Sequence, residues 1–300
     1  MPEKNPKCPI CTDIAQLVGD IPGRIPPIAR FAIYHCPRCH FSFIPEYRTD
    51  YQTVYSEAYY RGQGADPLVN YAFDHQRPEI TLRQYEWHGL TDIFRTLMKY
   101  SAGKARWLDY GCGLGSLVRY GRQQGVNVFG YEPYGSQNQP NQISPAEQNS
   151  GSYLLPKESL QKESFDYITA IEVIEHTADP LAFLRDIRPL LKAGGILFLT
   201  TGNAKPFRDR LAKWSYAGCP DVHISFFEPE TLALALEKTG FKPVYAGYIP
   251  GFTEIIKYKI LKNLGFKKRS ALFDVLPWPI LSRLADSKIK VTALPIGVAF

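Results

Sequence analysis

The sequence lacks any run of about 18 apolar residues free of charge, the length that a helix needs to cross a membrane. Its first residues, Met-Pro-Glu-Lys-Asn-Pro-Lys-Cys, also lack the apolar stretch of a secretory signal. We therefore expect a cytoplasmic protein with no transmembrane segment and with its six cysteines reduced. At 300 residues and 45% hydrophobic, the chain can bury a full α/β core and still carry a small accessory unit.

Strong charge of one sign is absent as well. The net charge is +6 and the isoelectric point about 8.9, which argues only weakly for nucleic acid, so we do not expect a nucleic-acid partner. Part of the excess lies in one basic run, made of Lys257, Lys259, Lys262, Lys267, Lys268 and Arg269. We interpret this run as a solvated helix face. The alternatives are a site for an anionic substrate and peripheral contact with a membrane surface.

The cysteines are few, but four of them form two Cys-x-x-Cys pairs. These are Cys8 with Cys11 and Cys36 with Cys39. In a reducing compartment such pairs favour a metal, and four thiolates close the tetrahedral coordination of a structural Zn²⁺. His35 and His40 flank the second pair and are alternative ligands.

Apolar runs alternate with helical patterns over most of the chain, which is typical of parallel βαβ units. We expect strands at 106–110, 126–131, 165–171, 196–201, 241–248 and 291–300, and helices at 114–124, 181–191 and 230–239. Gly194-Gly195 is expected to end one helix and open the next strand, and the polar stretch 137–151 to be a loop. Three regions result: a zinc-ribbon module at 1–45, a helical connecting segment at 46–103 with its clearest helix at 85–100, and the main α/β domain at 104–300.

The most informative stretch runs from Leu108 to Gly115, where an apolar strand enters three alternating glycines and a helix follows at once. Glycine is needed where the backbone turns tightly and a ligand approaches the main chain closely. Glu132 follows the next strand, at a spacing that suits a carboxylate binding the ribose hydroxyls of an adenosine. The same spacing would fit a dinucleotide-dependent dehydrogenase.

Asp109-Tyr110-Gly111-Cys112-Gly113-Leu114-Gly115 resembles the first motif, D-x-G-C-G-x-G, of class I S-adenosylmethionine-dependent methyltransferases. Residues 165–176 resemble the family's fourth strand with the segment after it, and residues 190–197 its turn into the fifth strand. The order and spacing agree over roughly 105–245, which disfavours the dehydrogenase. The resemblance implies a Rossmann-like sheet of seven mostly parallel strands with helices on both faces, and S-adenosylmethionine as cofactor.

Roles for individual residues follow from the resemblance. Gly111, Gly113 and Gly115 would let the methionine part of the cofactor lie against the backbone. Asp109, next to Tyr110 in the motif, would organise the loop and reach the amino group, and Glu132 would bind the ribose. Ile171 and Glu172 would line the cofactor near the reacting methyl. The family's helix after the second strand is replaced by the polar stretch 134–150, so no adenine contact is assigned.

Two histidines are candidates for the base that a hydroxyl acceptor requires. His176 follows the fourth strand and His223 follows the fifth, and each could instead be a structural residue. The segment Ile171-Glu172-Val173-Ile174 departs from the [DN]-P-P-[YF] pattern of enzymes that methylate exocyclic base amines. We therefore expect an oxygen or carbon acceptor on a small molecule, sugar or lipid precursor.

The whole pattern resembles a bacterial methyltransferase group with an N-terminal zinc ribbon, related to zinc-containing sugar and small-molecule methyltransferases. The shared features are the cysteine pairs, the segment Tyr55-Ser56-Glu57-Ala58-Tyr59-Tyr60, and His223 before an aromatic segment. Two other functions remain open. One is an RNA methyltransferase that grips phosphate with the ribbon and the basic run, and the other is a non-catalytic S-adenosylmethionine-binding module.

Overall fold

A six-stranded sheet forms the centre of the computed structural model, which describes residues 5–101, 104–133, 153–244, 251–281 and 297–299. In sheet order the strands are β5 (Val128–Tyr131), β4 (Trp107–Tyr110), β6 (Phe165–Ile171), β7 (Leu191–Thr200), β10 (Gly297–Ala299) and β9 (Pro243–Val244). The first four pair in parallel, whereas β10 runs antiparallel to both neighbours. The mostly parallel α/β sheet predicted from the sequence is confirmed.

The sequence predicts seven strands in the central sheet, whereas the described residues form six strands there. At the β5 edge Leu154 adds a single parallel bridge to Gly130, in the place that a further strand would take. The predicted loop at 137–151 and the polar stretch at 134–150 lie outside the described residues.

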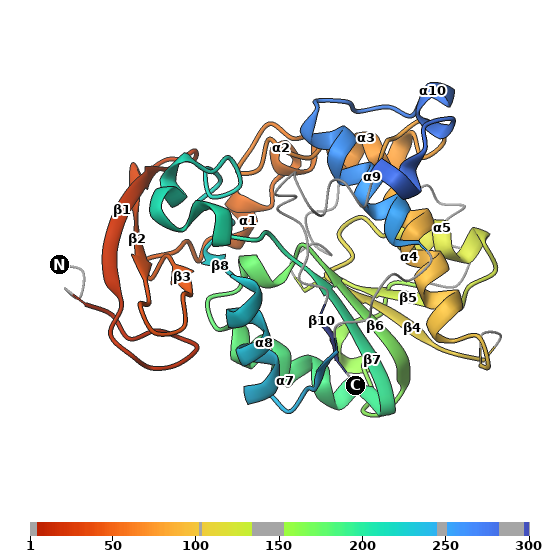
Figure 1. Ribbon diagram of the computed structural model, residues 1–300, viewed down its shortest axis with the longest axis horizontal. Coiled ribbons are helices and arrows are strands. Elements are labelled where there is room, and N and C mark those ends of the chain that lie inside the picture. The colour runs from red at the N-terminus through yellow and green to blue at the C-terminus, as the bar shows by residue number, and fades with distance from the viewer. Residues whose placement is uncertain (1–4, 102–103, 134–152, 245–250, 282–296, 300) are drawn as a thin grey trace.

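Helices cover both faces of the sheet, α7 and α8 on one and α4, α5 and α9 on the other (Figure 1). Their bounds are Pro180–Ile187, Pro229–Lys238, Gln84–Leu97, Ser116–Gln123 and Phe252–Asn263. Successive strand residues point to opposite faces. Ile168 and Leu197 therefore join the cluster with α7 and α8, while Tyr167 and Phe198 join the cluster with α4, α5 and α9.

The segment before the main domain is helical, as predicted. It contains α1 (Tyr51–Val54), α2 (Glu57–Tyr60), α3 (Tyr71–Gln76) and α4, which corresponds to the helix expected at 85–100. The remaining helices are short: α10 (Ala271–Asp274) and 3₁₀ turns at Lys157–Ser159, Ile174–His176, Arg188–Leu190 and Lys205–Lys213. Within the described residues, no helix combines the length and the apolar character needed to cross a membrane.

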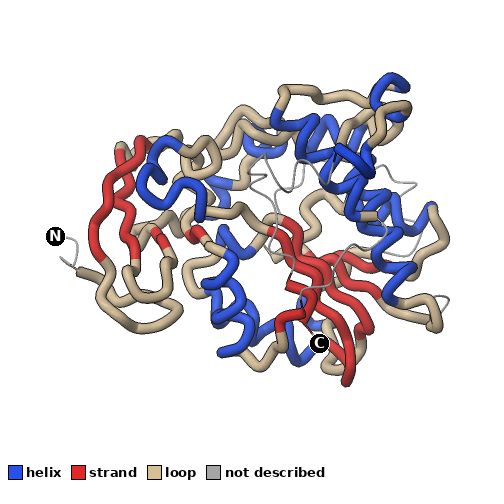
Figure 2. Tube along the Cα trace, in the orientation of Figure 1, coloured by secondary structure: helices blue, strands red, loops and turns tan. Residues whose placement is uncertain are grey.

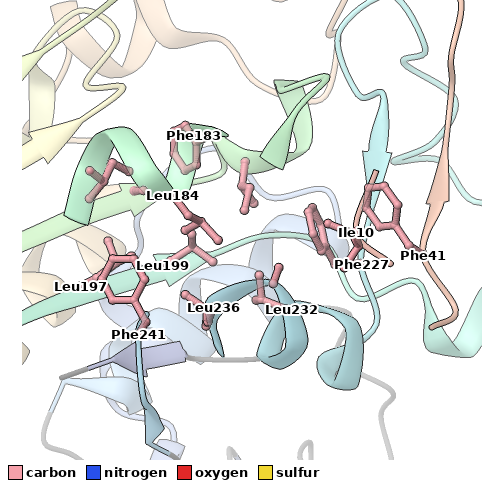
Figure 3. Close-up of a cluster of buried hydrophobic side chains, with 14 of the residues drawn as sticks. Ile10, Phe41, Phe183, Leu184, Leu197, Leu199, Phe227, Leu232, Leu236 and Phe241 are labelled. Atoms are coloured by element: carbon pink, nitrogen blue, oxygen red, sulfur yellow. The ribbon is translucent and has the colours of Figure 1, made fainter. Parts of the chain in front are cut away.

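The N-terminal unit is an antiparallel sheet, separate from the central one in Figure 2. Its strands are β1 (Gln16–Pro22), β2 (Arg30–His35), β3 (Ser42–Phe43) and β8 (Ser225–Phe226). The last of these comes from the main domain and pairs with β3. Ile10 and Phe41 of the N-terminal unit lie in one buried cluster with Phe227 and Leu232 of the main domain (Figure 3). The two parts therefore share a core.

The prediction for Gly194-Gly195 was wrong. The helix α7 ends at Ile187, a 3₁₀ turn follows, and β7 already begins at Leu191. The pairing of β7 with β6 is irregular between Leu191 and Ile196, and Gly194 there has a φ of 73°. The two glycines thus form a bulge inside the strand, where a left-handed residue is needed.

Candidate functional site

The carboxyl ends of β4, β5 and β6 open on a cavity of about 470 Å³. Strand order in the sheet reverses at β4, and such a switch point is where open α/β sheets bind ligands. The other walls come from α1 to α4, from α9 and from the loop that carries Tyr216 and His223. Of the site residues predicted from the sequence, the cavity is lined by Asp109, Tyr110, Gly111, Gly113, Glu132, Ile171, Glu172, His176 and His223.

The glycine loop forms the floor of this cavity. Gly111 has a φ of 83°, and a Cβ there would lie 2.6 Å from Val173 Cγ2, so a side chain is excluded on both counts. Gly113 has a φ of 53°, and a Cβ there would meet no atom within 4 Å, which leaves open space above the backbone. Gly115, with a φ of 72°, is the N-cap of α5 and is absent from the described cavity lining. Two of the three glycines therefore line the cavity, and their contact with a cofactor stays a prediction.

Two acidic residues flank the loop, and one of them is hydrogen-bonded to it. Asp109 is buried and accepts a hydrogen bond from Thr169 Oγ1 at 2.7 Å, and Thr169 in turn accepts one from Trp107 Nε1 at 2.8 Å. Burial raises the pKa of Asp109 to about 7. Glu132 accepts a hydrogen bond from the Gly113 N–H at 2.8 Å, which ties the end of β5 to the loop after β4. Both residues line the cavity near the carboxyl ends of β4 and β5.

Two glutamates share one tyrosine on the opposite wall: Glu175 is buried, and Glu172, whose side chain is 21% exposed, lines the cavity. The Tyr216 hydroxyl donates its one hydrogen to Glu172 Oε2 at 2.9 Å and is also hydrogen-bonded to Glu175 Oε1. Burial opposes ionisation of Glu172, but Lys259 outweighs it and lowers the pKa to about 2. Burial and the neighbouring Glu172 raise the pKa of Glu175 to about 8. At neutral pH one carboxyl is therefore ionised and the other carries a proton, the split that acid–base sites use.

The structure brings the two predicted histidines together beside these glutamates. The rings of His176 and His223 are 5.0 Å apart between centroids and perpendicular. His223 Nδ1 lies 2.7 Å from the Tyr216 carbonyl oxygen, which can only accept, so Nδ1 carries the proton and Nε2 is the acceptor of the neutral ring. His176 Nδ1 lies 3.1 Å from the Tyr55 hydroxyl, and burial lowers its pKa well below the ordinary value.

These histidines also form a mixed ligand set with Glu175. One donor atom from each of the three residues lies within 4.8 Å of the others. The carboxyl of Glu175 is, however, already engaged by Tyr216 and by Thr201 Oγ1 at 2.8 Å. The three residues are thus a candidate ligand set whose carboxyl group is already hydrogen-bonded within the protein.

The interpretation of the basic run as a solvated face was wrong for three of its members. Lys257 is 3% exposed and its Nζ lies 2.6 Å from Asp274 Oδ1. Lys259 bridges Glu172 at 2.9 Å and Glu86 at 3.6 Å, and Lys262 lines the cavity. Helix α9 packs against α4, and this packing turns these lysines inward. Lys267, Lys268 and Arg269 are exposed, as expected.

The predicted cysteine set is assembled in the N-terminal unit. The four sulfur atoms of Cys8, Cys11, Cys36 and Cys39 all lie within 4.8 Å of one another. The two histidines that were alternative ligands make other contacts. His35 Nδ1 lies 2.9 Å from Ser42 Oγ, and the rings of His35 and His40 stack on each other. A tetrahedral zinc with bonds of about 2.3 Å holds its sulfurs roughly 3.8 Å apart, so this set fits the metal.

Sequence reasoning missed several residues of the site. Glu175 is the second acid of the pair with Glu172, and Tyr216 is hydrogen-bonded to both. Positive charge is brought to the cavity by Arg83, Lys259 and Lys262. Glu175 gave a signal because it directly precedes a histidine that was singled out, and the two lysines belong to the basic run for which a site for an anionic substrate was the alternative.

The strand order and the glycine loop define an α/β protein of the doubly wound, nucleotide-binding class. Residues 73–246, more than half of the chain, match the family model described as a methyltransferase domain. The chain belongs to this family, the class I S-adenosylmethionine-dependent methyltransferase domains.

Curated relatives carry the name ubiquinone biosynthesis O-methyltransferase. The protein of Dinoroseobacter shibae is 34% identical over 153 residues, which is 46% of this chain and 60% of that one. The protein of Parvibaculum lavamentivorans is 37% identical over 102 residues, 33% of this chain and 40% of that one. The chain thus spans about 60% or less of the length of these relatives.

Solved structures with a similar chain are more distant. An S-adenosylmethionine-dependent methyltransferase from Mesorhizobium loti is 16% identical, with a TM-score of 0.43 over 69% of this chain and 95% of that one. The Burkholderia thailandensis 1,6-didemethyltoxoflavin-N1-methyltransferase is 17% identical, with a TM-score of 0.41 over 72% and 92%.

Proposed function

We propose that this protein transfers the methyl group of S-adenosylmethionine to a hydroxyl oxygen of a small molecule. One observation carries the proposal: the glycine loop, Glu132 and both histidines line a single cavity, and Glu175 lies directly beside the histidines. The curated relatives are named as O-methyltransferases, which supports oxygen over carbon as the acceptor atom.

The cofactor half of the cavity is the β4–β5 side. Gly111 and Gly113 keep the backbone bare for the methionine part, and Glu132 is placed to accept the ribose hydroxyls. Asp109 and Glu172 offer carboxylates to the positive charges of the ligand. When bound, S-adenosylmethionine supplies an electrophilic methyl group carried on a sulfonium.

The acceptor half contains the histidines and a wall of aromatic side chains. His223 Nε2 accepts the proton of the acceptor hydroxyl, while the Tyr216 carbonyl holds the ring in the required tautomer. His176 and Glu175 lie beside it, and the carboxylate that Glu175 forms above its raised pKa stabilises the positive charge on the ring. The tyrosines that line this half, which suit an apolar or aromatic acceptor, are Tyr51, Tyr55, Tyr59, Tyr60 and Tyr71.

We also propose a structural Zn²⁺ held by Cys8, Cys11, Cys36 and Cys39. Four thiolates complete its coordination, so no position is left for a water or substrate. The metal would stabilise the zinc-ribbon module at 1–45, with 46–103 as the acceptor-side segment and 104–300 as the methyltransferase domain. The shared core around Phe41 and Phe227 couples its binding to the stability of the whole chain.

Methyl transfer to small acceptors tests the function. Purified protein is incubated with S-adenosylmethionine and with matched hydroxyl and amine compounds, phenols against anilines, and release of S-adenosylhomocysteine is measured. We expect turnover with hydroxyl acceptors only, and an O-methyl ether in the product by NMR. Turnover of the amines in preference to the hydroxyls would contradict the proposal.

A further inference from the structure

Three cations from α4 and α9 line the cavity, but only two of them are paired. Arg83 is 3.0 Å from both Asp74 and Glu86. Lys259 lies 2.9 Å from Glu172. Within the described part of the chain, Lys262 has no carboxylate within salt-bridge distance, and its Nζ lies 5.9 Å from the centroid of the Tyr258 ring.

The surroundings of Lys262 do not favour a lone positive charge. Burial, together with the neighbouring cations Lys259 and Arg83, lowers the pKa of Lys262 to about 8. An ammonium group removed from water is costly unless an opposite charge meets it. At neutral pH the group is nevertheless still largely protonated, so it is available to an anion.

The two carboxylates that act on Lys262 are engaged elsewhere. Glu172 is held by Lys259 and Tyr216. Asp66 accepts the Leu68 N–H at 2.9 Å and lies 3.7 Å from Cys219 Sγ. Neither reaches the Lys262 ammonium, and the partner that this lysine lacks is supplied most simply by a ligand.

We propose that Lys262, supported by Lys259 and Arg83, forms an anion subsite that binds a carboxylate or phosphate group of the acceptor. This inference rests on the proposed methyl transfer, and it adds that the acceptor molecule carries a negative charge. The aromatic ring of Tyr71 borders the same end of the cavity, so an aromatic acid is the acceptor that both features suit. Lys262 could instead bind the carboxylate of the cofactor. The experiment distinguishes an anionic group on the acceptor from the cofactor carboxylate.

The experiment compares phenol, 4-hydroxybenzoate and phenyl phosphate as ligands. Their binding to the full chain saturated with S-adenosylhomocysteine is titrated at pH 7 by ligand-observed NMR. We expect at least one of the anions to bind roughly tenfold tighter than phenol. Lys262→Met keeps the aliphatic stem and is expected to remove the preference, and Lys262→Arg is expected to keep it. Lys267→Met changes an exposed lysine of the same basic run and is expected to have no effect.

The affinity for S-adenosylhomocysteine is measured in the same variants. An unchanged affinity in Lys262→Met, together with loss of the anion preference, supports the acceptor subsite. A tenfold weaker affinity with the anion preference intact would assign the lysine to the carboxylate of the cofactor and overturn the proposal. Equal binding of phenol and both anions to the unmodified chain would overturn it too. If S-adenosylhomocysteine does not bind at all, the proposed function fails, and titration of the anions alone still decides the role of Lys262.

Discussion

Replacing Cys39 with serine is expected to lower the melting temperature of the whole chain by more than about 10 °C, not only that of its N-terminal unit. A structural zinc site contributes about 10–16 kcal/mol in small zinc domains, against about 5–15 kcal/mol for the net stability of a whole domain. For a chain of this size each 1 kcal/mol shifts the midpoint by roughly 2–4 °C. The Cys39 carbonyl accepts a hydrogen bond from Thr231 of α8, and Cys39 belongs to the cluster that covers one face of the central sheet. Loss of the site therefore disturbs the methyltransferase core.

Calorimetry and a zinc assay on the same samples check this result. Cys219→Ser is the matched control, because Cys219 is a buried cysteine, as Cys39 is, but lies outside the cysteine cluster. We expect it to retain one zinc per chain and to melt within a few degrees of the unmodified protein. A Cys39→Ser chain that melts like the control, or an unmodified chain purified without zinc, would refute the metal site.

The His223→Asn variant is expected to lose about 10²–10⁴-fold in kcat, the usual contribution of a general base. Asparagine keeps a donor near the position of Nδ1, which faces the Tyr216 carbonyl, but removes the acceptor Nε2. Affinity for S-adenosylhomocysteine should stay the same, because the cofactor half of the cavity is untouched. The measurement is release of S-adenosylhomocysteine with any acceptor that the unmodified protein turns over.

His88→Asn, on the exposed side of α4, is the control and should retain full activity. The pH profile gives a second readout. Glu175 loses its proton near pH 8, and the resulting carboxylate, 4.0 Å from His176 Nε2, stabilises positive charge on the histidines. We therefore expect kcat to rise through pH 8 and the rise to disappear in Glu175→Gln. An unchanged kcat in His223→Asn would show that this histidine is not the base.

Much of the main domain could be predicted because its signals are local. The strand predicted at 165–171 has the bounds observed for β6. The predicted glycine turn follows β4, and at position 111 its backbone conformation and close packing exclude any side chain. The four cysteines were grouped correctly from spacing alone. In each case the sequence within a few residues determines the structure.

The meeting of His176 and His223 follows from topology. β6 and β7 are neighbours in the sheet, and the segments after two parallel neighbours leave at the same edge. Each histidine was identified separately, and the strand order explains why their two segments meet at one edge, but not the perpendicular contact of the rings.

The lysines of α9 could not be placed in this way. Which face of that helix is buried depends on how it packs against α4, a contact between residues far apart in the chain. A run of alternating charged and apolar residues leaves the orientation open, and the partners of Lys259 lie on α4 and after β6. The backbone of Glu172 could not be predicted either. This residue lies at the cavity wall with a φ of 56°, a conformation that favours glycine.

The most direct test of the account is the affinity for S-adenosylhomocysteine, measured by calorimetry in the unmodified chain and in Glu132→Ala. The account predicts binding that weakens at least about tenfold in the variant, or about 1.4 kcal/mol. Glu158→Ala changes an exposed acid outside the cavity and should bind as the unmodified chain does. Absence of binding in a folded chain, or equal binding in all three proteins, would contradict the assignment of the cavity to the cofactor.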